Sequence, residues 1–505
     1  MNITFFRQNS FSWLLALKAF VALLLLLLFC PPLLPDEAQY WLWSQHLDIG
    51  YYSKPPAIAW VIALSYSILG HCEVAVRFPS LLMSNLAAWY LAKTMKSLGA
   101  SDAASRLSTW LFVFSPIVLY GSFAATTDVG LLLGWCAVCY YLEQPMALYR
   151  HRWAIVFWSM WALLFKPSIL VLGLASFFRF WDPERRLKAG YIFLGCVLGG
   201  VFPFLWNLEH DFVTVRHIFT QLLGPGQDRE VASFWQTIHF KRPLDLILAQ
   251  VLLFSPWVSF KIAQRVKAVI KEPLTPVKWH ATLALVILGF TLLGSFKVKF
   301  QANWPLIAFP SFFCLLSFAQ LSKKWVRGHV VAHSALFLMA LTLFYGQDKG
   351  WPVLSQSPKN LNLFRSVEGW QVIKDKMPHL PWKQDEGFWI SDRYQSCSLL
   401  AFYGPSQEVY WFNLHGARQN QFSFWPVASC YLGSPARFVL VDACSEQEME
   451  AQAPLSIEKI KPYFQKVLQV TVVPLWTYRG KVEKCALIID LEGYLGSRPK
   501  DPKSF

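Results

Sequence analysis

The chain has 505 residues, of which 55% are hydrophobic and only 15% are charged, and its mean hydropathy is +0.35. Soluble domains carry about 25% charged residues, so this composition excludes an ordinary soluble protein. The net charge of +15 would suit a nucleic-acid partner, but the basic residues form short clusters between apolar segments, as cytoplasmic loops of membrane proteins do. We therefore exclude nucleic acid as a partner.

The apolar segments predict a polytopic α-helical membrane protein with about eleven transmembrane helices. The first segment, Ser12 to Cys30, is followed by Pro31-Pro32 rather than by a cleavage site, so we predict an uncleaved span. A further apolar stretch, Ala57 to Gly70, could raise the count to twelve. The predicted spans are 11–30, 77–95, 106–122, 129–143, 153–165, 167–180, 189–206, 244–263, 279–296, 304–320 and 329–345.

Clusters of Lys and Arg decide between these counts and set the orientation. They occur at 93–106, 150–152, 179–188, 261–278 and 323–327. All five lie on one side of the membrane only if Ala57–Gly70 does not cross it and lies along the interface instead. The positive-inside rule makes that side cytoplasmic. We therefore expect a cytoplasmic N-terminus, a long first periplasmic loop at 31–76 with interfacial helices, and a periplasmic C-terminal domain.

The composition divides the chain into a transmembrane domain, residues 1–345, and a water-soluble α/β domain, residues 346–505. Four short apolar runs of the second domain predict strands, and three other stretches predict helices. Its four cysteines could form disulfides in three connectivities. The predicted strands are Phe388–Ile390, Val409–Phe412, Phe438–Val441 and Ala486–Ile489; the predicted helices are Asn360–Lys376, Arg393–Phe402 and Ser456–Val467; the cysteines are Cys397, Cys430, Cys444 and Cys485.

Polar and charged residues gather in the segments predicted to face the periplasm. Each has a structural alternative: Asp36 or Asp128 could cap a helix, and Lys166 could be an interfacial lysine that extends toward water. As a set they suggest transfer from a lipid phosphate, because a lysine can stabilise the phosphate that leaves and a carboxylate can accept a proton from the attacking group. The residues are Asp36, Glu37, Lys54, Asp128, Lys166, Arg216, His217 and Asn303.

Several motifs then resemble a known family. Asp36–Trp43 and Gly50–Pro56 are similar to the first periplasmic loop of bacterial glycosyltransferases of families 39 and 83, which have the GT-C fold. This group includes protein O-mannosyltransferases and the aminoarabinose transferase of lipid A. The similarity continues through Arg77-Phe78-Pro79, Thr127-Asp128, Lys166-Pro167, Asn303-Trp304-Pro305 and Arg418–Trp425.

The resemblance implies an inverting glycosyltransferase that moves a sugar from a polyprenyl (undecaprenyl) phosphate to an envelope acceptor. The acceptor stays open between lipid A or lipopolysaccharide core, another glycolipid, and a protein. The implied catalytic residues are Asp36, Asp128 and Glu37, with Asp36 as the base. The implied phosphate-binding residues are Lys54 and Lys166, together with Arg216 and His217, which match only loosely. The implied substrate pocket contains Tyr40, Tyr52 and Asn303.

Two points leave the chemistry open. A divalent metal ion, if the reaction uses one, would be held by Asp36 and Asp128. The sequence also departs from the aminoarabinose-transferase pattern, because Ser53 replaces a glutamate and Gln39 replaces an arginine. These departures leave the identity of the sugar undetermined.

The main alternative is a transporter or flippase of lipid-linked sugars. It predicts charged residues near the middle of several spans or paired broken helices. Here the charged residues lie at the ends of the spans, and the two halves show no repeat. A membrane sensor would need a cytoplasmic output module, for which the predicted cytoplasmic loops are too short.

Overall fold

The computed structural model describes residues 3–179, 182–223, 239–298, 300–348, 350–351, 358–362, 364–383, 386–425, 427 and 429–500. The chain forms two compact units. We call Met1–Leu28 with Asp48–Leu338 the transmembrane unit, and Phe29–Leu47 with Met339–Phe505 the C-terminal unit. The segment 29–47, which the sequence assigned to the N-terminal domain, is thus grouped with the C-terminal unit.

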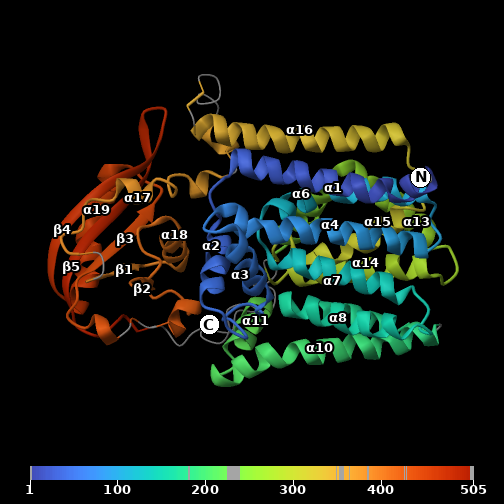
Figure 1. Ribbon diagram of the computed structural model, residues 1–505, viewed down its shortest axis with the longest axis horizontal. Coiled ribbons are helices and arrows are strands. Elements are labelled where there is room, and N and C mark those ends of the chain that lie inside the picture. Colours follow the sequence, from blue (N-terminus) through green and yellow to red (C-terminus); the bar gives the residue numbers. More distant parts are fainter. Residues whose placement is uncertain are drawn as a thin grey trace. The chain divides into compact units, whose positions relative to one another are not determined.

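The transmembrane unit is helical throughout its described residues (Figure 1). A helix lies at each of the eleven predicted spans and at Ala57–Gly70. The elements are α1 Ile3–Phe29, α3 Ala57–Leu69, α4 Glu73–Ser97, α5 Asp102–Val113, α6 Pro116–Phe123, α7 Thr127–Leu142, α8 Tyr149–Phe165, η1 Pro167–Ile169, α9 Leu170–Phe177, α10 Pro183–Glu209, α11 Val213–Leu223, α12 Lys241–Phe254, α13 Pro256–Val269, α14 Pro276–Ser295, η3 Trp304–Ala308, α15 Phe309–Leu316 and α16 Lys323–Asp348, the last of which continues into the C-terminal unit.

Four of the described helices are long and apolar enough to cross a membrane, and two bent helix pairs would raise this number to six. The four are α1, α10, α14 and α16, and shorter apolar helices account for other predicted spans. The count of eleven spans therefore remains a prediction, whereas the polytopic helical architecture is observed.

Two predicted spans are not straight. The segment 106–122 divides into α5 and α6, which are bent by 64°, and 244–263 divides into α12 and α13, which are bent by 102°. A proline starts the second helix of each pair, Pro116 and Pro256. Proline lacks the amide hydrogen that would continue the preceding helix but is well accommodated in a first turn. At the sharper bend Ser255 has a positive φ of 79°, so the predicted span 244–263 is a bent pair of helices rather than one straight helix.

The packing of α7, α8 and α10 depends on glycines. A Cβ at Gly130 of α7 would lie 2.3 Å from the ring of Phe165 in α8, and one at Gly134 would lie 2.6 Å from the Ala162 side chain. A Cβ at Gly195 of α10 would lie 2.3 Å from the carbonyl oxygen of Val156. Small residues permit such close helix packing within membranes. The glycines therefore hold α7 and α10 directly against α8.

The C-terminal unit is an α/β domain built on a five-stranded sheet in the order β2-β1-β3-β5-β4. Strands β2, β1 and β3 are parallel, whereas β3, β5 and β4 are antiparallel. The strands are β1 Phe388–Ser391, β2 Val409–Trp411, β3 Ala436–Asp442, β4 Phe464–Tyr478 and β5 Lys481–Tyr494; the helices are α2 Pro35–Gln45, α17 Ile373–Lys376, α18 Tyr394–Tyr403 and α19 Glu446–Ile460; short 3-10 turns lie at η4 Lys359–Leu361, η5 Arg365–Val367, η6 Gln421–Phe424, η7 Ser429–Tyr431 and η8 Lys461–Tyr463.

Alternate residues of the sheet pack against α19, with Phe438, Leu487 and Met449 among the buried contacts. A buried ion pair fixes the register of β3 and β5, because Arg437 and Asp490 face each other and their side chains lie 2.6 Å apart. Arg437 also donates to the carbonyl oxygens of residues 378 and 379. The charge is thus well satisfied, as a buried arginine requires.

The four predicted strands and the helix Arg393–Phe402 are confirmed, but two predicted helices are wrong. The described residues of Asn360–Lys376 form short 3-10 turns and one α-helical turn, and the chain is interrupted at Gly369, whose φ is 83°. Ser456–Val467 changes from α19 to β4 next to Pro462, which lies in η8. The long strand β4 was not predicted because it lies at the edge of the sheet, where polar residues alternate with apolar ones. The four cysteines of this unit, Cys397, Cys430, Cys444 and Cys485, form no disulfide with one another in the structure.

Helix α2, which carries the first-loop motif, packs within the C-terminal unit against α18. The rings of Trp41 and Phe402 meet edge to face at 4.8 Å, and the amide of Leu33 donates to the Tyr403 hydroxyl at 2.7 Å. Residues 37–44 are buried around the whole helix. This burial explains the many aromatic residues of the motif.

Candidate active site

Three of the predicted site residues meet in the transmembrane unit. Lys166 donates from Nζ to Oδ1 of Asp128 at 2.7 Å, and Asn303 donates from Nδ2 to Oδ2 of Asp128 at 2.6 Å. The Asp128 side chain is 10% exposed and that of Lys166 is 18% exposed. An ammonium group has three donors, and Asp128 takes one of them. The other two can bind an anionic group such as a phosphate.

The ends of three elements bring these side chains together. Asp128 lies in the first turn of α7, Lys166 follows the last residue of α8, and Asn303 precedes η3. The close packing at Gly130 and Phe165 places the start of α7 beside the end of α8. Asp128 is therefore more than a helix cap, and Lys166 is more than an interfacial lysine.

Replacing Gly130 with alanine should disturb this cluster. The added methyl group would overlap Phe165, and overpacking of this kind costs about 1–3 kcal/mol. We expect Gly130→Ala to lower the melting temperature of the detergent-solubilised protein. As a control, Gly190→Ala in α10 adds a Cβ that meets nothing within 4 Å, so it should leave stability unchanged or raise it slightly. Equal melting temperatures for the two variants would contradict the packing role of Gly130.

A second group of predicted residues lies on α11 and on the loop before α3. The rings of Tyr52 and His217 lie 4.9 Å apart, and both residues are buried. Thr214 of α11 donates to the carbonyl oxygen of Tyr51 at 3.1 Å, and the amide of Tyr51 donates to the carbonyl oxygen of Lys54 at 3.2 Å. The structure thus brings His217 to Tyr52 and joins α11 to the loop that carries Lys54.

This loop is also held from α3 and α10. Trp206 donates from its indole to the carboxylate of Asp48 at 2.9 Å, and Trp60 donates to the carbonyl oxygen of Asp48 at 3.0 Å. A Cβ at Gly50 would lie 2.7 Å from Trp206, so the motif needs glycine there. The neighbouring predicted residue Arg216 is exposed.

The acidic pair of the first-loop motif has two different environments in the C-terminal unit. Asp36 is exposed in the first turn of α2, whereas Glu37 is buried. The Glu37 carboxylate accepts the amide hydrogen of Leu34 at 2.9 Å, so it supports the start of its own helix. The predicted pocket residue Tyr40 is also buried, and its ring packs against that of Trp43 at 5.3 Å.

Tyr394 lies near Asp36 and near Arg418, and neither Tyr394 nor Arg418 was predicted as part of the site. Burial raises the pKa of the Tyr394 hydroxyl, the negative charge of Asp36 raises it further, and the positive charge of Arg418 opposes the change. Tyr394 therefore lies within electrostatic range of both. Arg418 begins a stretch that resembles the family, which was the available signal. No such signal in the sequence marked Tyr394, because only the packing of α18 on α2 brings this residue close to Asp36.

A polar pocket of about 570 Å³ lies in the C-terminal unit at the carboxyl end of β3. Such edges of parallel strands are common ligand sites. Pro35, the residue before Asp36, lines this pocket. Its other walls include two arginines, two tryptophans and the first turn of α18, namely Arg365, Arg393, Trp370, Trp476, Gln395 and Ser396. Arg393 is 3.1 Å from the carboxylate of Asp442.

The described residues contain no group of three or more His, Cys, Asp or Glu side chains that could hold a metal ion. The Asp128 carboxylate is occupied by Lys166 and Asn303. The residues around Asp128 therefore do not fit a metal site, and we assign no step to a metal.

Comparisons with known proteins agree with this architecture. Residues 53–208 match the family model of dolichyl-phosphate-mannose-protein mannosyltransferases, a segment that includes Lys54, Asp128 and Lys166. Across 95% of this chain and 98% of the other, the structure resembles ArnT of Cupriavidus metallidurans in the apo state, with a TM-score of 0.61 and 15% identity. The same protein bound to undecaprenyl phosphate matches equally well, with 14% identity. The chain is thus a polytopic membrane protein with the GT-C fold and a C-terminal sheet domain, and the predicted fold class is confirmed.

Two curated relatives specify the resemblance further. The chain is 28% identical over 310 residues to the lipid A galacturonosyltransferase RgtD of Rhizobium johnstonii, which covers 58% of this chain and 61% of that protein. It is 25% identical over 235 residues to the undecaprenyl phosphate-alpha-4-amino-4-deoxy-L-arabinose arabinosyl transferase of Pectobacterium atrosepticum, covering 44% and 35% respectively. The alignments thus span about three fifths and one third of these relatives. The predicted resemblance to GT-C glycosyltransferases is confirmed.

Proposed function

We propose that this protein is an inverting glycosyltransferase of the bacterial inner membrane. It takes a sugar from undecaprenyl phosphate and transfers it to lipid A or the lipopolysaccharide core. The observation that carries the proposal is the ion pair of Lys166 with Asp128, held by Asn303 within a GT-C fold. The names of the two curated relatives support the donor and acceptor classes.

At the donor end, the ammonium of Lys166 binds the phosphate and stabilises the negative charge that forms when the bond between the sugar and the phosphate oxygen breaks. Asp128 holds the ammonium in place, and Asn303 holds Asp128. We assign Lys54 to the same phosphate, with the loosely matched Arg216 and His217 in support. Fixed charges that need no rearrangement during the reaction are effective in this role.

At the acceptor end, the Asp36 carboxylate accepts the proton of an acceptor hydroxyl as its oxygen attacks the anomeric carbon. One bond forms between this oxygen and the sugar, and the sugar–phosphate bond breaks to release undecaprenyl phosphate. Asp36 suits a base because its carboxylate is exposed, whereas the buried Glu37 supports the helix. Tyr40 and Tyr52 are assigned to the walls of the substrate pocket.

The polar pocket beside Pro35 provides a binding site for the saccharide of the acceptor. Tryptophan faces bind the apolar faces of sugars, and arginine pairs well with carboxylate and phosphate groups. We expect Arg393→Gln and Trp476→Ala to raise the KM for the acceptor at least tenfold and to leave the KM for the donor unchanged. Steady-state kinetics with each substrate varied separately will show this. The control is Lys383→Ala, whose side chain is 80% exposed; a parallel rise in the donor KM of the pocket variants would argue against an acceptor site.

The membrane orientation is part of the proposal. The basic clusters face the cytoplasm, and the C-terminal unit lies in the periplasm, where lipid-linked sugars are consumed by enzymes of this kind. Cysteine labelling with a membrane-impermeant reagent tests this orientation. Exposed Cys430 should react in spheroplasts, and reaction only after lysis would contradict the orientation.

Mass spectrometry of envelope glycolipids from a wild-type and a deletion strain tests the function. We expect lipid A or core species of the deletion strain to lack one sugar, and the plasmid-borne gene to restore it. Unchanged glycolipids with an accumulation of lipid-linked sugar on the cytoplasmic side would favour the transporter alternative.

A further inference from the structure

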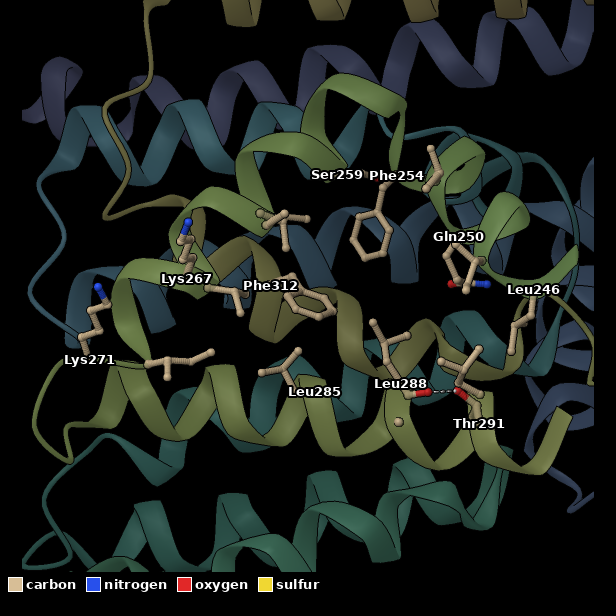
Figure 2. Close-up of a pocket in the computed structure, with 18 residues that line it drawn as sticks. Leu246, Gln250, Phe254, Ser259, Lys267, Lys271, Leu285, Leu288, Thr291 and Phe312 are labelled. Atoms are coloured by element: carbon tan, nitrogen blue, oxygen red, sulfur yellow. Dashed lines mark hydrogen bonds between the residues drawn. The ribbon is translucent and has the colours of Figure 1, made fainter. Parts of the chain in front are cut away.

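A second pocket, of about 740 Å³, lies within the transmembrane unit between α12, α13, α14 and α15. It is separate from the cluster around Asp128 and has nearly uniform apolar walls. Figure 2 shows Phe254, Phe312, Leu285 and Leu288 along its middle. Its lining residues come from both sides of the 102° bend between α12 and α13, and from α14 and α15.

The few polar groups of the groove lie mainly at its ends. Gln250 and Thr291 lie at one end, and Lys267 and Lys271 lie at the other (Figure 2). The Thr291 hydroxyl donates to carbonyl oxygens of its own helix. Its donor is therefore satisfied without a polar ligand in the groove. The shape and composition thus suit one molecule with a long apolar chain and a charged head.

The Gln250 end is the one near the candidate active site. Gln250 donates from Nε2 to the carbonyl oxygen of Ala302 at 2.9 Å, and the next residue, Asn303, binds Asp128. The two lysines lie at the opposite end of the groove. A head group bound to them would therefore lie away from Lys166, the residue assigned to the donor phosphate.

Lys267 and Lys271 carry charges that no carboxylate of the described residues neutralises. Lys267 lies in the last turn of α13 and Lys271 lies two residues beyond the end of this helix, and both line the same end of the groove (Figure 2). The nearest acidic residue in sequence, Glu272, pairs with Arg265 at 2.8 Å. Lys278 is bound by the carbonyl oxygens of Ile270 and Glu272. Both lysines thus remain available to an anion.

We infer that this groove binds an anionic phospholipid of the cytoplasmic leaflet. Its acyl chain lies between α13 and α14, and its phosphate binds Lys267 and Lys271. Basic pockets between transmembrane helices on the cytoplasmic side bind anionic head groups in this way. The lysines belong to a cluster that the positive-inside rule places on the cytoplasmic side, which favours a phospholipid over the periplasmic donor. This lipid would support the bent helix pair that carries Gln250.

Lipid retention by the purified full-length protein tests the inference. Native mass spectrometry can compare phosphatidylglycerol, phosphatidylcholine and undecaprenyl phosphate, added at equal concentrations. We expect the wild type to prefer phosphatidylglycerol over phosphatidylcholine. The double variant Lys267→Gln/Lys271→Gln should bind phosphatidylglycerol roughly thirtyfold less tightly, as expected for the loss of two lysine contacts. The control Lys323→Gln/Lys324→Gln removes another exposed pair of lysines and should behave as the wild type.

A second variant tests the position of the chain. Gly289 lines the groove, and a Cβ there meets nothing within 4 Å, so Gly289→Leu places an additional apolar side chain in the groove from a position where the Cβ has open space. It should reduce retention of phosphatidylglycerol, whereas Gly190→Leu, also in open space, should not. Equal retention of neutral and anionic lipids by the wild type would overturn the inference. So would a loss of undecaprenyl phosphate rather than phosphatidylglycerol in the double lysine variant.

Discussion

Replacing Lys166 with methionine should lower kcat/KM for sugar transfer about 100-fold, the usual effect of losing one fixed group that stabilises developing charge. The methionine keeps the length of the side chain but removes the ammonium that we assign to the donor phosphate. Lys166→Arg should retain part of the activity because it keeps the charge. Initial rates with a polyprenyl-phosphate sugar measure both effects. Lys324→Met, on a predicted cytoplasmic loop, is the matched control and should have wild-type rates.

The ion pair also makes a prediction about Asp128. If Asp128 acts by holding Lys166, Asp128→Asn should raise the donor KM, and Asp128→Asn/Lys166→Met should be no slower than Lys166→Met alone. Residues that act as a unit show such non-additive effects. A double variant much slower than either single variant would mean that Asp128 has an independent catalytic role. If Lys166→Met has wild-type rates, the hypothesis that Lys166 binds the donor phosphate is wrong.

Replacing Asp36 with asparagine should reduce transfer by about 10²–10⁴, the contribution of a general base, and should leave the melting temperature unchanged. The carboxylate is exposed, so its loss costs little stability. Glu37→Gln should behave in the opposite way. It weakens a charged hydrogen bond to the amide of Leu34, which should cost about 1 kcal/mol, and the folded fraction should keep most of its activity.

Transfer rates and thermal unfolding of the two variants separate these roles. Full activity of Asp36→Asn would contradict its assignment as the base. If Glu37→Gln is inactive and its melting temperature is unchanged, Glu37 rather than Asp36 has the catalytic role. Donor binding, measured with labelled undecaprenyl phosphate, should be normal in both variants, because neither side chain is assigned to the phosphate.

The sequence predicted the helical architecture well because long apolar segments are strong local signals. It also placed Asp128, Lys166 and Asn303 near one another, since each lies at the periplasmic end of a predicted span. It missed the bends at Pro116 and Pro256, because a bent pair and a straight span have the same average hydropathy. The close contacts of Gly130 and Gly134 were also missed, since a glycine within a span gives no sign of the helix that it faces.

In the C-terminal unit the sequence failed to predict other features, namely an edge strand and contacts between distant residues. Strands β1, β2 and β3 and the middle of β5 were predictable because they contain continuous apolar runs, whereas β4 carries polar residues on an exposed edge. The grouping of α2 with α18 depends on contacts between residues far apart in the sequence, such as Leu33 with Tyr403, which are 370 positions apart. No local pattern reports such contacts. For this reason Tyr394 and the pocket beside Pro35 became visible only in the structure.

Reconstituted transfer by the purified protein tests the central claim most directly. The protein is incubated with lipid A and with undecaprenyl phosphate that carries galacturonic acid or 4-amino-4-deoxy-arabinose, the sugars named in the two curated relatives. We predict that lipid A gains the mass of one sugar residue from one of these donors and that one undecaprenyl phosphate is released for each sugar transferred. Movement of intact lipid-linked sugar across the liposome membrane, with no change in the mass of lipid A, would contradict the proposed function.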